Sequence, residues 1–381
     1  MNKVFGKDFV LGVLGGGQLG RMLIQEAINL NIHVAVLDPA ADAPCADVAN
    51  TFVQGSFNDY NTVLEFGKKA DIITIEIEHV NLDALEELER LGKRVYPTTR
   101  ALRTIKDKGL QKLFYQENEI PTAPFFLVKN KEEAEELLNE GPFMQKMREG
   151  GYDGKGVTPL RNENDLPQAF HAPSVLEKMV DFEKEIAVIV ARNEKGETST
   201  FPLVEMEFNP EANLVEFIFS PANVTSTLES EAKDIALQVA EKLKHVGLLA
   251  VEMFVTKDGK ILVNEIAPRA HNSGHHTIEA CYTSQYAQHL RAILNLPLGS
   301  TELRSPAVMI NLLGEKGFSG PVFYKNMEDV LHTEGAFVHL YGKSETKPFR
   351  KMGHITVCDH NLEKAKETAK RLLHLVQVIS I

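Results

Sequence analysis

A glycine-rich stretch near the middle of the chain has the residue types of a phosphate-binding loop. It runs from Gly150 to Gly156 with the sequence GGYDGKG. Backbone N–H groups that lack neighbouring side chains can approach phosphate oxygens closely, and Lys155 would add a point charge, as would Lys146 on the strand predicted just upstream. The Walker A spacing is absent, which excludes a P-loop protein. A glycine-rich hairpin with a solvated lysine is the alternative interpretation.

Two glutamates are candidate metal ligands. Glu252 and Glu265 lie on the two strands of a predicted hairpin, Leu248 to Thr256 and Lys260 to Ile266, joined by an Asp-Gly turn. Counted from that turn, both side chains can point to one face, because side chains alternate along a strand. Mg²⁺ prefers one or two carboxylates together with substrate phosphates. Two exposed edge glutamates are the alternative, although both residues have apolar neighbours in the sequence.

A dense polar segment, NEIAPRAHNSGH, follows the second glutamate from Asn264 to His275. Arg269 could clamp a planar anion such as bicarbonate through two hydrogen bonds. A zinc site built from His271, His275 and His276 is disfavoured, because no cysteine and no His-Glu-x-x-His helix lies nearby. The segment therefore predicts an anion site.

The sequence GGGQLG from Gly15 to Gly20 follows a predicted strand and opens a predicted helix. It satisfies G-x-G-x-x-G, a pattern that lets backbone N–H groups at a helix N-terminus bind an anion. Asp38 stands about where a ribose-binding acid would. A nicotinamide-dependent dehydrogenase and a tight β–α turn without a ligand both remain open on this motif alone.

A basic cluster near the C-terminus contains Lys343, Arg350 and Lys351. In an acidic chain it is a candidate phosphate site. A solvated basic hairpin is an equally good interpretation of these residues.

Hydrophobic periodicity predicts the elements that position these residues. In the first hundred residues the predicted strands and helices alternate, with strands at Phe9 to Leu14, His33 to Leu37 and Asp71 to Ile77, and helices at Gly20 to Asn29, Asn58 to Lys69 and Leu82 to Leu91. Such alternation indicates a parallel sheet covered by helices. A further helix, Thr104 to Asn118, ends before two prolines that mark a domain boundary.

The rest of the chain is richer in strands. The predicted strands of the middle part are Pro142 to Met147, Ser174 to Met179, Lys184 to Ala191, Thr200 to Glu207 and Val215 to Ser220, followed by a helix from Glu229 to His245. This pattern indicates an α+β domain with antiparallel strands. A small third domain is predicted from the strands Ala307 to Leu312, Phe337 to Leu340 and His354 to Cys358 and the helix Leu362 to His374.

Composition limits the function classes. The 381 residues carry a formal net charge of −12, with 43% hydrophobic and 25% charged residues. This length suggests two or three domains, and the charge excludes a general nucleic-acid-binding surface. No apolar run approaches the roughly 18 residues of a membrane span. The three cysteines, Cys45, Cys281 and Cys358, are far apart, so a reduced cytoplasm is the expected location.

Six motifs together resemble the ATP-grasp superfamily, and within it the N5-carboxyaminoimidazole ribonucleotide synthetase family, almost from end to end. They are GGGQLGR at Gly15–Arg21, EIEHV at Glu76–Val80, GGYDGKG at Gly150–Gly156, EKMV at Glu177–Val180, NEIAPRAHNSGH at Asn264–His275 and RKMGH at Arg350–His354. The resemblance implies an ATP-grasp fold, of mixed α/β and α+β class. A Rossmann-like parallel-sheet domain would span residues 1–103, the ATP-grasp domain 104–300 with a central lid subdomain at about 120–180, and a small β-rich domain 301–381.

The resemblance also assigns residues to ATP and Mg²⁺. Those expected at ATP are Lys108, Lys146, Gly150, Gly151, Tyr152, Gly154, Gly156, Glu177, Lys178, Met179, Val180, Glu185, Asn264 and Glu265. Glu252 and Glu265 would hold Mg²⁺. Ala267 stands where many ATP-grasp enzymes have asparagine, so Asn264 or water would complete the ligand set.

A second group of residues would hold the substrates. An aminoimidazole ribonucleotide would lie among Gly17, Gln18, Leu19, Glu76, Tyr152, Asp153, Lys343, Arg350 and Lys351. Bicarbonate would lie near Arg269, His271 and Asn272, and the expected catalytic residues are these three with Asp153 and Lys155.

The implied activity is the ATP-dependent carboxylation of 5-aminoimidazole ribonucleotide in purine biosynthesis, by a cytoplasmic homodimer. ATP would phosphorylate bicarbonate to carboxyphosphate, and Asp153 would orient or deprotonate the attacking amine. A formate-dependent glycinamide ribonucleotide transformylase shares the architecture and is the nearest alternative. An NAD-dependent oxidoreductase and a non-enzymatic nucleotide-binding protein account for fewer of the motifs.

Overall fold

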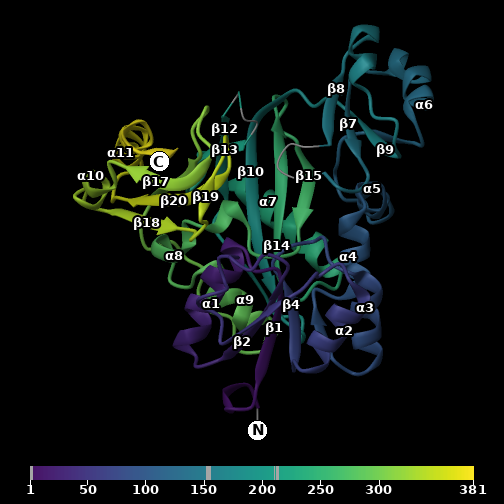
Figure 1. Cartoon of the computed structure of the whole chain (residues 1–381). Helices are drawn as coiled ribbons and strands as arrows, with labels where there is room; N and C mark the ends of the chain where they lie inside the picture. Colours follow the sequence, from purple (N-terminus) through teal and green to yellow (C-terminus); the bar gives the residue numbers. More distant parts are fainter. Residues whose placement is uncertain (1–2, 152–155, 210, 212–213) are drawn as a thin grey trace.

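The computed structural model describes residues 3–151, 156–209, 211 and 214–381. The N-terminal part, at the bottom of Figure 1, is a sheet in the order β3-β2-β1-β4-β5 with all strands parallel. Its elements are β1 (Val10–Leu14), α1 (Gln18–Asn29), β2 (His33–Asp38), β3 (Thr51–Gln54), α2 (Tyr60–Lys68), β4 (Ile72–Ile75), α3 (Leu82–Arg90) and β5 (Arg94–Tyr96). The predicted parallel sheet is confirmed, and β3 and β5 are additional strands.

The helix predicted from Thr104 to Asn118 is wrong as a single element. The structure has two helices, α4 (Thr99–Lys106) and α5 (Lys108–Glu117), separated at Asp107. Asp107 has an extended backbone, with φ −102° and ψ 109°, and its carboxylate accepts the N–H groups of Gly109 and Leu110. An aspartate in this role caps the start of a new helix. The break therefore makes Lys108 the first residue of a new helix.

A small antiparallel sheet follows, with the order β6-β9-β7-β8. Its elements are β6 (Phe125–Val128), α6 (Lys131–Glu136), β7 (Phe143–Met147), β8 (Val157–Leu160) and β9 (Ser174–Lys178). Val128, Phe143, Leu160 and Leu176 form a core of their own under α6. This sheet stands at the upper right of Figure 1.

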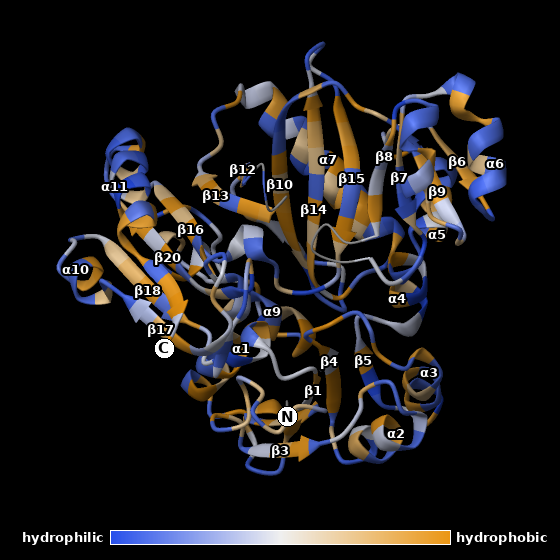
Figure 2. Ribbon diagram, turned by 45° about the horizontal axis from the view of Figure 1, so that its top comes forward, coloured by the Kyte–Doolittle hydropathy of each residue, from blue (hydrophilic) through white to orange (hydrophobic). Residues whose placement is uncertain are grey.

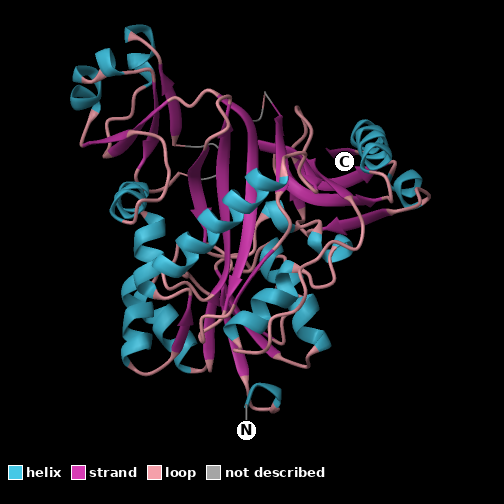
Figure 3. Cartoon of the chain, turned by 180° about the vertical axis from the view of Figure 1, so that it is seen from behind, coloured by secondary structure: helices cyan, strands magenta, loops and turns pink. Residues whose placement is uncertain are grey.

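A nine-stranded sheet forms the centre of the molecule, in the order β15-β14-β10-β12-β13-β16-β20-β18 with β11 beside β10. Its first elements are β10 (Phe182–Arg192), β11 (Thr198–Thr200), β12 (Val204–Asn209), β13 (Leu214–Ser220), α7 (Ser226–Lys242), β14 (Gly247–Thr256) and β15 (Ile261–Ala267). Helix α7 crosses one face of the long strands (Figure 3), where Ile235 and Val239 join the core. The prediction of a single strand from Thr200 to Glu207 is wrong, because β11 ends at Thr200 and β12 begins at Val204. Pro202 lies between them and lacks the N–H group that a strand needs for pairing.

The C-terminal strands continue this same sheet. Strands β16 (Ala307–Leu313), β20 (Lys351–Cys358) and β18 (Ala336–Leu340) pair in turn, and β16 pairs with β13. The other C-terminal elements are α8 (Thr277–Ala280), α9 (Gln285–Ile293), β17 (Gly320–Lys325), α10 (Met327–Leu331), β19 (Glu345–Thr346), α11 (Leu362–Leu375) and β21 (Gln377–Ser380). Strands β19, β17 and β21 form a separate three-stranded sheet.

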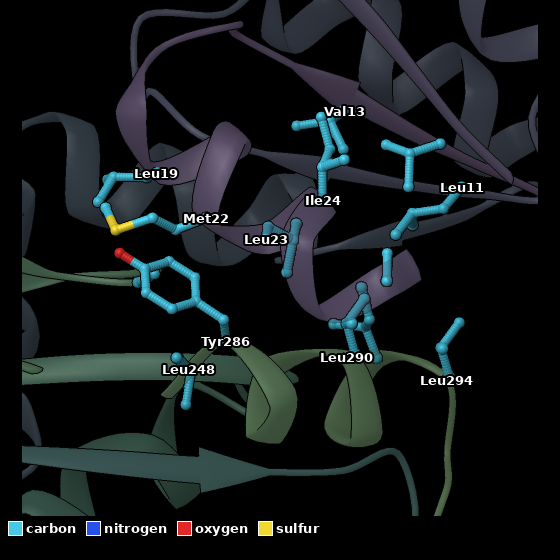
Figure 4. Packing of buried hydrophobic residues seen from close by; sticks show 14 of the residues in the cluster. Leu11, Val13, Leu19, Met22, Leu23, Ile24, Leu248, Tyr286, Leu290 and Leu294 are labelled. Carbon is cyan, nitrogen blue, oxygen red and sulfur yellow. The ribbon is translucent and has the colours of Figure 1, made fainter. Parts of the chain in front are cut away.

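A shared hydrophobic core fastens the N-terminal sheet to the central one. Leu23 and Ile24 of α1 pack toward Leu290 and Leu294 at α9, with Leu248 of β14 beneath (Figure 4). Hydrophobic residues dominate the long strands β10, β14 and β15, whereas the outer helices α6 and α11 are mainly hydrophilic (Figure 2). The two halves of the cavity described below are therefore held in fixed relation by packing.

Truncation of this core should destabilise the whole chain. Leu290 is fully buried in the cluster that joins the two domains. Leu290→Ala is expected to lower the free energy of unfolding by about 2–5 kcal/mol, because it removes buried methyl groups and leaves a cavity. Urea denaturation followed by circular dichroism measures this change. The exposed Leu331, 68% accessible, is the matched control, and an equal loss for Leu331→Ala would contradict the assignment.

Among the residues that the structure describes, no helix has the length and apolar character needed to cross a membrane.

Candidate active site

A cavity of about 630 Å³ lies where the N-terminal sheet, the α4–α5 junction and the end of β15 meet. Its lining residues come from all three regions and are Gly17, Gln18, Leu19, Asp38, Phe57, Glu76, Ile77, Glu78, His79, Ile105, Lys106, Lys108, Gln111, Arg148, Gly150, Gly151, Glu265, Ile266, Ala267, Arg269, His271, Asn272, His275 and Lys351. Lysine, arginine and histidine side chains converge here. The cavity is therefore suited to anionic ligands.

A second depression of about 700 Å³ lies beside α7 and has a different character. Its lining residues include Glu119, Glu231 and Asp234 with several serines, but no lysine, arginine or histidine among those the structure describes. An acidic lining disfavours phosphate and bicarbonate. The chemistry that the sequence predicts belongs to the first cavity.

Glu252 and Glu265 stand directly opposite each other on β14 and β15. Burial and the nearby carboxylates of Glu265 and Glu185 raise the pKa of Glu252. The Lys108 ammonium lies 2.5 Å from Glu265 Oε2 and holds the pKa of Glu265 below its usual range. The predicted shared face is confirmed by this register.

The carboxylate pair fits a magnesium ion that takes its remaining ligands from phosphates and water. Repulsion between the two carboxylates raises the pKa of Glu252, and a divalent cation would relieve that repulsion. Among the described residues, no group of three or more histidines, cysteines or carboxylates is arranged as a metal site.

Lys146 and Glu177 belong to a buried cluster next to this pair. Lys146 Nζ lies 3.0 Å from Glu177 Oε2 and donates to Asn264 Oδ1 at 2.8 Å. The Glu177 carboxylate also pairs with Lys112, at 3.3 Å. The Glu177 side chain is therefore engaged by two lysines.

Three other residues predicted at ATP lie around this cluster. Lys178 and Met179 use their backbone N–H groups to bond Pro124 and Pro142. Glu185 on β10 is partly buried, and burial raises its pKa to about 7 despite the nearby Lys146. None of these three, nor Val180, is among the residues that line the cavity itself.

Glu76 closes the glycine-rich turn at the N-terminal side of the cavity. Its Oε1 accepts the backbone N–H of Leu19 at 3.2 Å, and a Cβ on Gly17 would lie only 2.4 Å from that oxygen. Burial raises the pKa of Glu76 to about 7, although Arg269 and backbone N–H groups act against this. Asp38 accepts the N–H of Gly16 at 2.7 Å, so it holds the turn together.

The segment after β15 reaches across to the N-terminal domain. Arg269 Nη2 pairs with Glu78 Oε1 at 2.8 Å. His271 Nε2 lies 3.5 Å from Glu252 Oε1, and His271 Nδ1 contacts Ser273 Oγ at 2.9 Å. These contacts place an imidazole beside the carboxylate pair, and Arg269, His271 and Glu265 line the same cavity.

Asn272 and His275 are oriented by neighbours from other elements. Asn272 exchanges two amide hydrogen bonds of 2.9 Å with Asn311 of β16. His275 Nδ1 contacts Gln285 and Tyr286, both at 3.1 Å. The polar segment is therefore fixed by partners that the local sequence does not reveal.

The C-terminal basic cluster divides between the cavity and the surface. Lys351 lines the cavity, whereas Lys343 and Arg350 are not among its lining residues. Lys343 Nζ donates to the Lys351 carbonyl at 2.7 Å, and Arg350 Nη1 donates to the Glu345 carbonyl at 2.6 Å. Of the three predicted residues, the structure brings only Lys351 to the other candidates.

Four predicted residues, Tyr152, Asp153, Gly154 and Lys155, lie outside the described residues. Gly150 and Gly151 line the cavity. The sequence motifs do not single out the lining residues Glu78, His79, Lys106 and Arg148 or the buried Lys112. Glu78 and His79 do stand inside the EIEHV motif, but no spacing rule marks the other three.

Comparison with known proteins identifies the family of this chain. Three family models match consecutive parts of the chain: a ribonucleotide synthetase preATP-grasp domain at residues 9–106, an ATP-grasp domain at 113–286 and a phosphoribosylaminoimidazole carboxylase C-terminal domain at 307–368. The N5-carboxyaminoimidazole ribonucleotide synthase of Bacillus subtilis is 40% identical over 354 residues, which are 91% of this chain and 90% of that protein. This chain belongs to the N5-carboxyaminoimidazole ribonucleotide synthetase family.

Solved structures of the family share the whole fold. The N5-carboxyaminoimidazole ribonucleotide synthetase of Thermotoga maritima has a TM-score of 0.91 and 44% identity, covering 98% of this chain and 100% of that one. The Aspergillus clavatus N5-carboxyaminoimidazole synthase, with a TM-score of 0.87 and 35% identity, covers 96% of this chain and 98% of that one. Its structure was determined with ADP and 5-aminoimidazole ribonucleotide. The family resemblance, the ATP-grasp fold and the ligase class predicted from the sequence are confirmed.

Proposed function

We propose that this synthetase uses ATP to carboxylate 5-aminoimidazole ribonucleotide with bicarbonate, giving N5-carboxyaminoimidazole ribonucleotide, ADP and phosphate. One observation carries the proposal. The cavity brings the glycine-rich turn with Glu76, the Glu265–Lys108 pair and the Arg269–His271 segment to one place. A ribonucleotide, a nucleoside triphosphate and a small planar anion can bind there side by side. The structure of a relative with ADP and 5-aminoimidazole ribonucleotide supports this proposal.

The reaction has two steps. A bicarbonate oxygen attacks the γ-phosphorus of ATP, so the bond to ADP breaks and carboxyphosphate forms. The exocyclic amine of the ribonucleotide then bonds to the carboxyl carbon, inorganic phosphate leaves, and the amine releases a proton. Lys108 and Lys146 would neutralise charge on the transferring phosphoryl group. Mg²⁺ held by Glu252 and Glu265 would supply further charge neutralisation when bound.

Arg269 and His271 would hold bicarbonate against the γ-phosphate. Arg269 is already oriented by Glu78 and therefore needs little rearrangement to present its guanidinium. Asp153 stays a sequence-based prediction for the group that orients the amine. The nucleotide contacts of Lys343 and Arg350, the three-domain division, a homodimer and a cytoplasmic location also remain proposals. Lys343 and Arg350 would have to turn from their present carbonyl partners to reach a ligand.

The decisive assay is Mg²⁺-dependent ADP release with 5-aminoimidazole ribonucleotide, with and without bicarbonate. ADP release that requires the ribonucleotide, together with a labile product trapped from labelled bicarbonate, is the expected result. Formate with glycinamide ribonucleotide is the control. Turnover in that control alone would assign the chain to the transformylase reaction.

Arg269 offers a specific test of the bicarbonate site. Arg269→Lys keeps the positive charge but cannot form bidentate hydrogen bonds with bicarbonate, so kcat/KM for bicarbonate should fall about 100-fold. The dissociation constant for ATP should stay within about threefold of that of the parent protein, since Arg269 does not belong to the buried cluster of Lys112, Lys146 and Glu177. Steady-state kinetics with bicarbonate-depleted buffer and nucleotide titrations measure both quantities. Unchanged bicarbonate kinetics would remove Arg269 from the site.

A further inference from the structure

Lys112 is a buried lysine with no role in the mechanism proposed above. It lies on α5, and its side chain is only 2% exposed. Its ammonium lies 2.6 Å from Thr122 Oγ1 and 3.3 Å from Glu177 Oε2. Lysine is almost never fully buried unless it is paired, so this position demands a physical reason.

Core stability does not supply that reason. Burial lowers the pKa of Lys112 to about 8 even though Glu177 raises it. A buried ion pair is often no more stable than a well-packed hydrophobic pair of similar volume. Stability alone therefore does not explain a lysine at this position, and its contacts point to a role in orienting another group.

Lys112 and Lys146 share one carboxylate. Both lysines reach the same oxygen of Glu177, Oε2, at 3.3 and 3.0 Å. The buried cluster thus contains two ammonium groups and one carboxylate. Because Glu177 is divided between two cations, it cannot neutralise Lys146 as a one-to-one partner would. The Glu265 and Glu185 carboxylates also interact with Lys146, so Lys112 mainly decides how strongly Glu177 holds the Lys146 ammonium.

The other contacts fix the direction of Lys146. Its Nζ donates to Asn264 Oδ1, and Asn264 immediately precedes the metal-ligand candidate Glu265. Lys112 has its own contacts on the other side of Glu177. The Lys112 ammonium donates a hydrogen bond to Thr122 Oγ1, and the Thr122 hydroxyl donates to the Val263 carbonyl at 2.8 Å. Helix α5, β9 of the small sheet and β15 of the central sheet are thereby joined through Lys112.

We propose that Lys112 is a positioning residue for ATP binding. Lys112 shares the Glu177 carboxylate with Lys146 and so keeps the Lys146 ammonium where it can contact the ATP phosphates. The inference rests on the proposed function only in assigning Lys146 to the ATP phosphates. Without Lys112, Glu177 pairs with Lys146 alone and draws the ammonium out of reach of a phosphate. Removal of both Lys112 and Glu177 frees Lys146 again.

Four variants test this by titration calorimetry with ATP, ADP and adenosine in the presence of Mg²⁺. Lys112→Met should weaken ATP and ADP binding about tenfold or more, the effect of one hydrogen bond to a charged group, and leave adenosine binding unchanged. The double variant Lys112→Met/Glu177→Gln should bind ATP within about threefold of the parent protein. Lys146→Met is the reference for complete loss of the phosphate contact. Lys233→Met, which breaks a half-buried pair with Glu229 on α7 outside the cavity, is the matched control.

The outcomes separate three explanations. If Lys112→Met only lowers the melting temperature and binds all three ligands normally, Lys112 is structural and the inference is overturned. If the double variant is as weak for ATP as Lys112→Met, Lys112 does not act through Glu177 and the inference also fails. Should Lys112→Met not fold, the double variant decides alone, with retained adenosine but lost ATP binding as the contrary result. An unaffected Lys146→Met would instead refute the proposed ATP contact.

Discussion

Glu265→Gln is expected to lower kcat about a thousandfold, the scale seen when a charged group at a phosphoryl-transfer site is removed. Two losses combine in this substitution. The carboxylate pair with Glu252 loses half of its charge, and Lys108 loses its partner at 2.5 Å. The Glu265 side chain is 44% exposed toward the cavity, so the change acts on a group that a ligand can reach.

The Mg²⁺ dependence distinguishes a metal ligand from a structural glutamate. Turnover of Glu265→Gln should need much higher Mg²⁺ than the parent protein, and added Mg²⁺ should restore part of kcat. Glu205→Gln is the matched control, because Glu205 pairs with Lys184 in the same central sheet outside the cavity. Activity within about threefold of normal at unchanged Mg²⁺ dependence would show that Glu265 holds no metal.

Local sequence patterns predicted most elements but not their interruptions. The parallel N-terminal sheet followed from alternating strand and helix periods, and the β14–β15 hairpin followed from its Asp-Gly turn. The break at Asp107 was missed, because helix periodicity continues through residues 99–117 and only the cap contacts of Asp107 end α4. A cap and a mid-helix aspartate look alike in a sequence.

Long-range partners limited the prediction of the site in the same way. Lysine is ordinarily exposed, so no pattern marks Lys112 as buried beside Glu177. The adjacent Arg350 and Lys351 appeared as one basic cluster, yet only Lys351 lines the cavity. Neighbouring side chains on extended backbone point to opposite sides, so a run of cations cannot all face one ligand. The six spaced motifs succeeded because they combine elements from the whole chain.

Glu76→Gln is expected to stabilise the ligand-free protein at pH 8 while it weakens the use of the ribonucleotide. Burial raises the pKa of Glu76 in the folded state to about 7, above its ordinary value of 4.5. Between these two values the folded state binds more protons than the unfolded state, so the free energy of unfolding falls as the pH rises. The full destabilisation is present above pH 7, where the buried carboxylate is ionised.

A glutamine at position 76 carries no charge and removes this dependence. The variant should exceed the parent protein by about 1–3 kcal/mol at pH 8 and by much less near pH 5. Its kcat/KM for 5-aminoimidazole ribonucleotide should fall about 100-fold, since an amide replaces the carboxylate beside Gly17 and Leu19. Urea denaturation at both pH values and steady-state kinetics measure the two effects.

Glu76→Gln is expected to raise the free energy of unfolding at pH 8 and to lower kcat/KM for the ribonucleotide. A substitution that merely damages the fold would lower stability and activity together. Glu65→Gln, at an exposed pair with Lys68 in the same domain, should change neither quantity. If Glu76→Gln is less stable than the parent protein at pH 8, the carboxylate is not held at an electrostatic disadvantage. If it is more stable and fully active, Glu76 stabilises the turn without serving the ribonucleotide. A more stable and impaired variant would show that Glu76 is kept ionised in an unfavourable place because the substrate requires it.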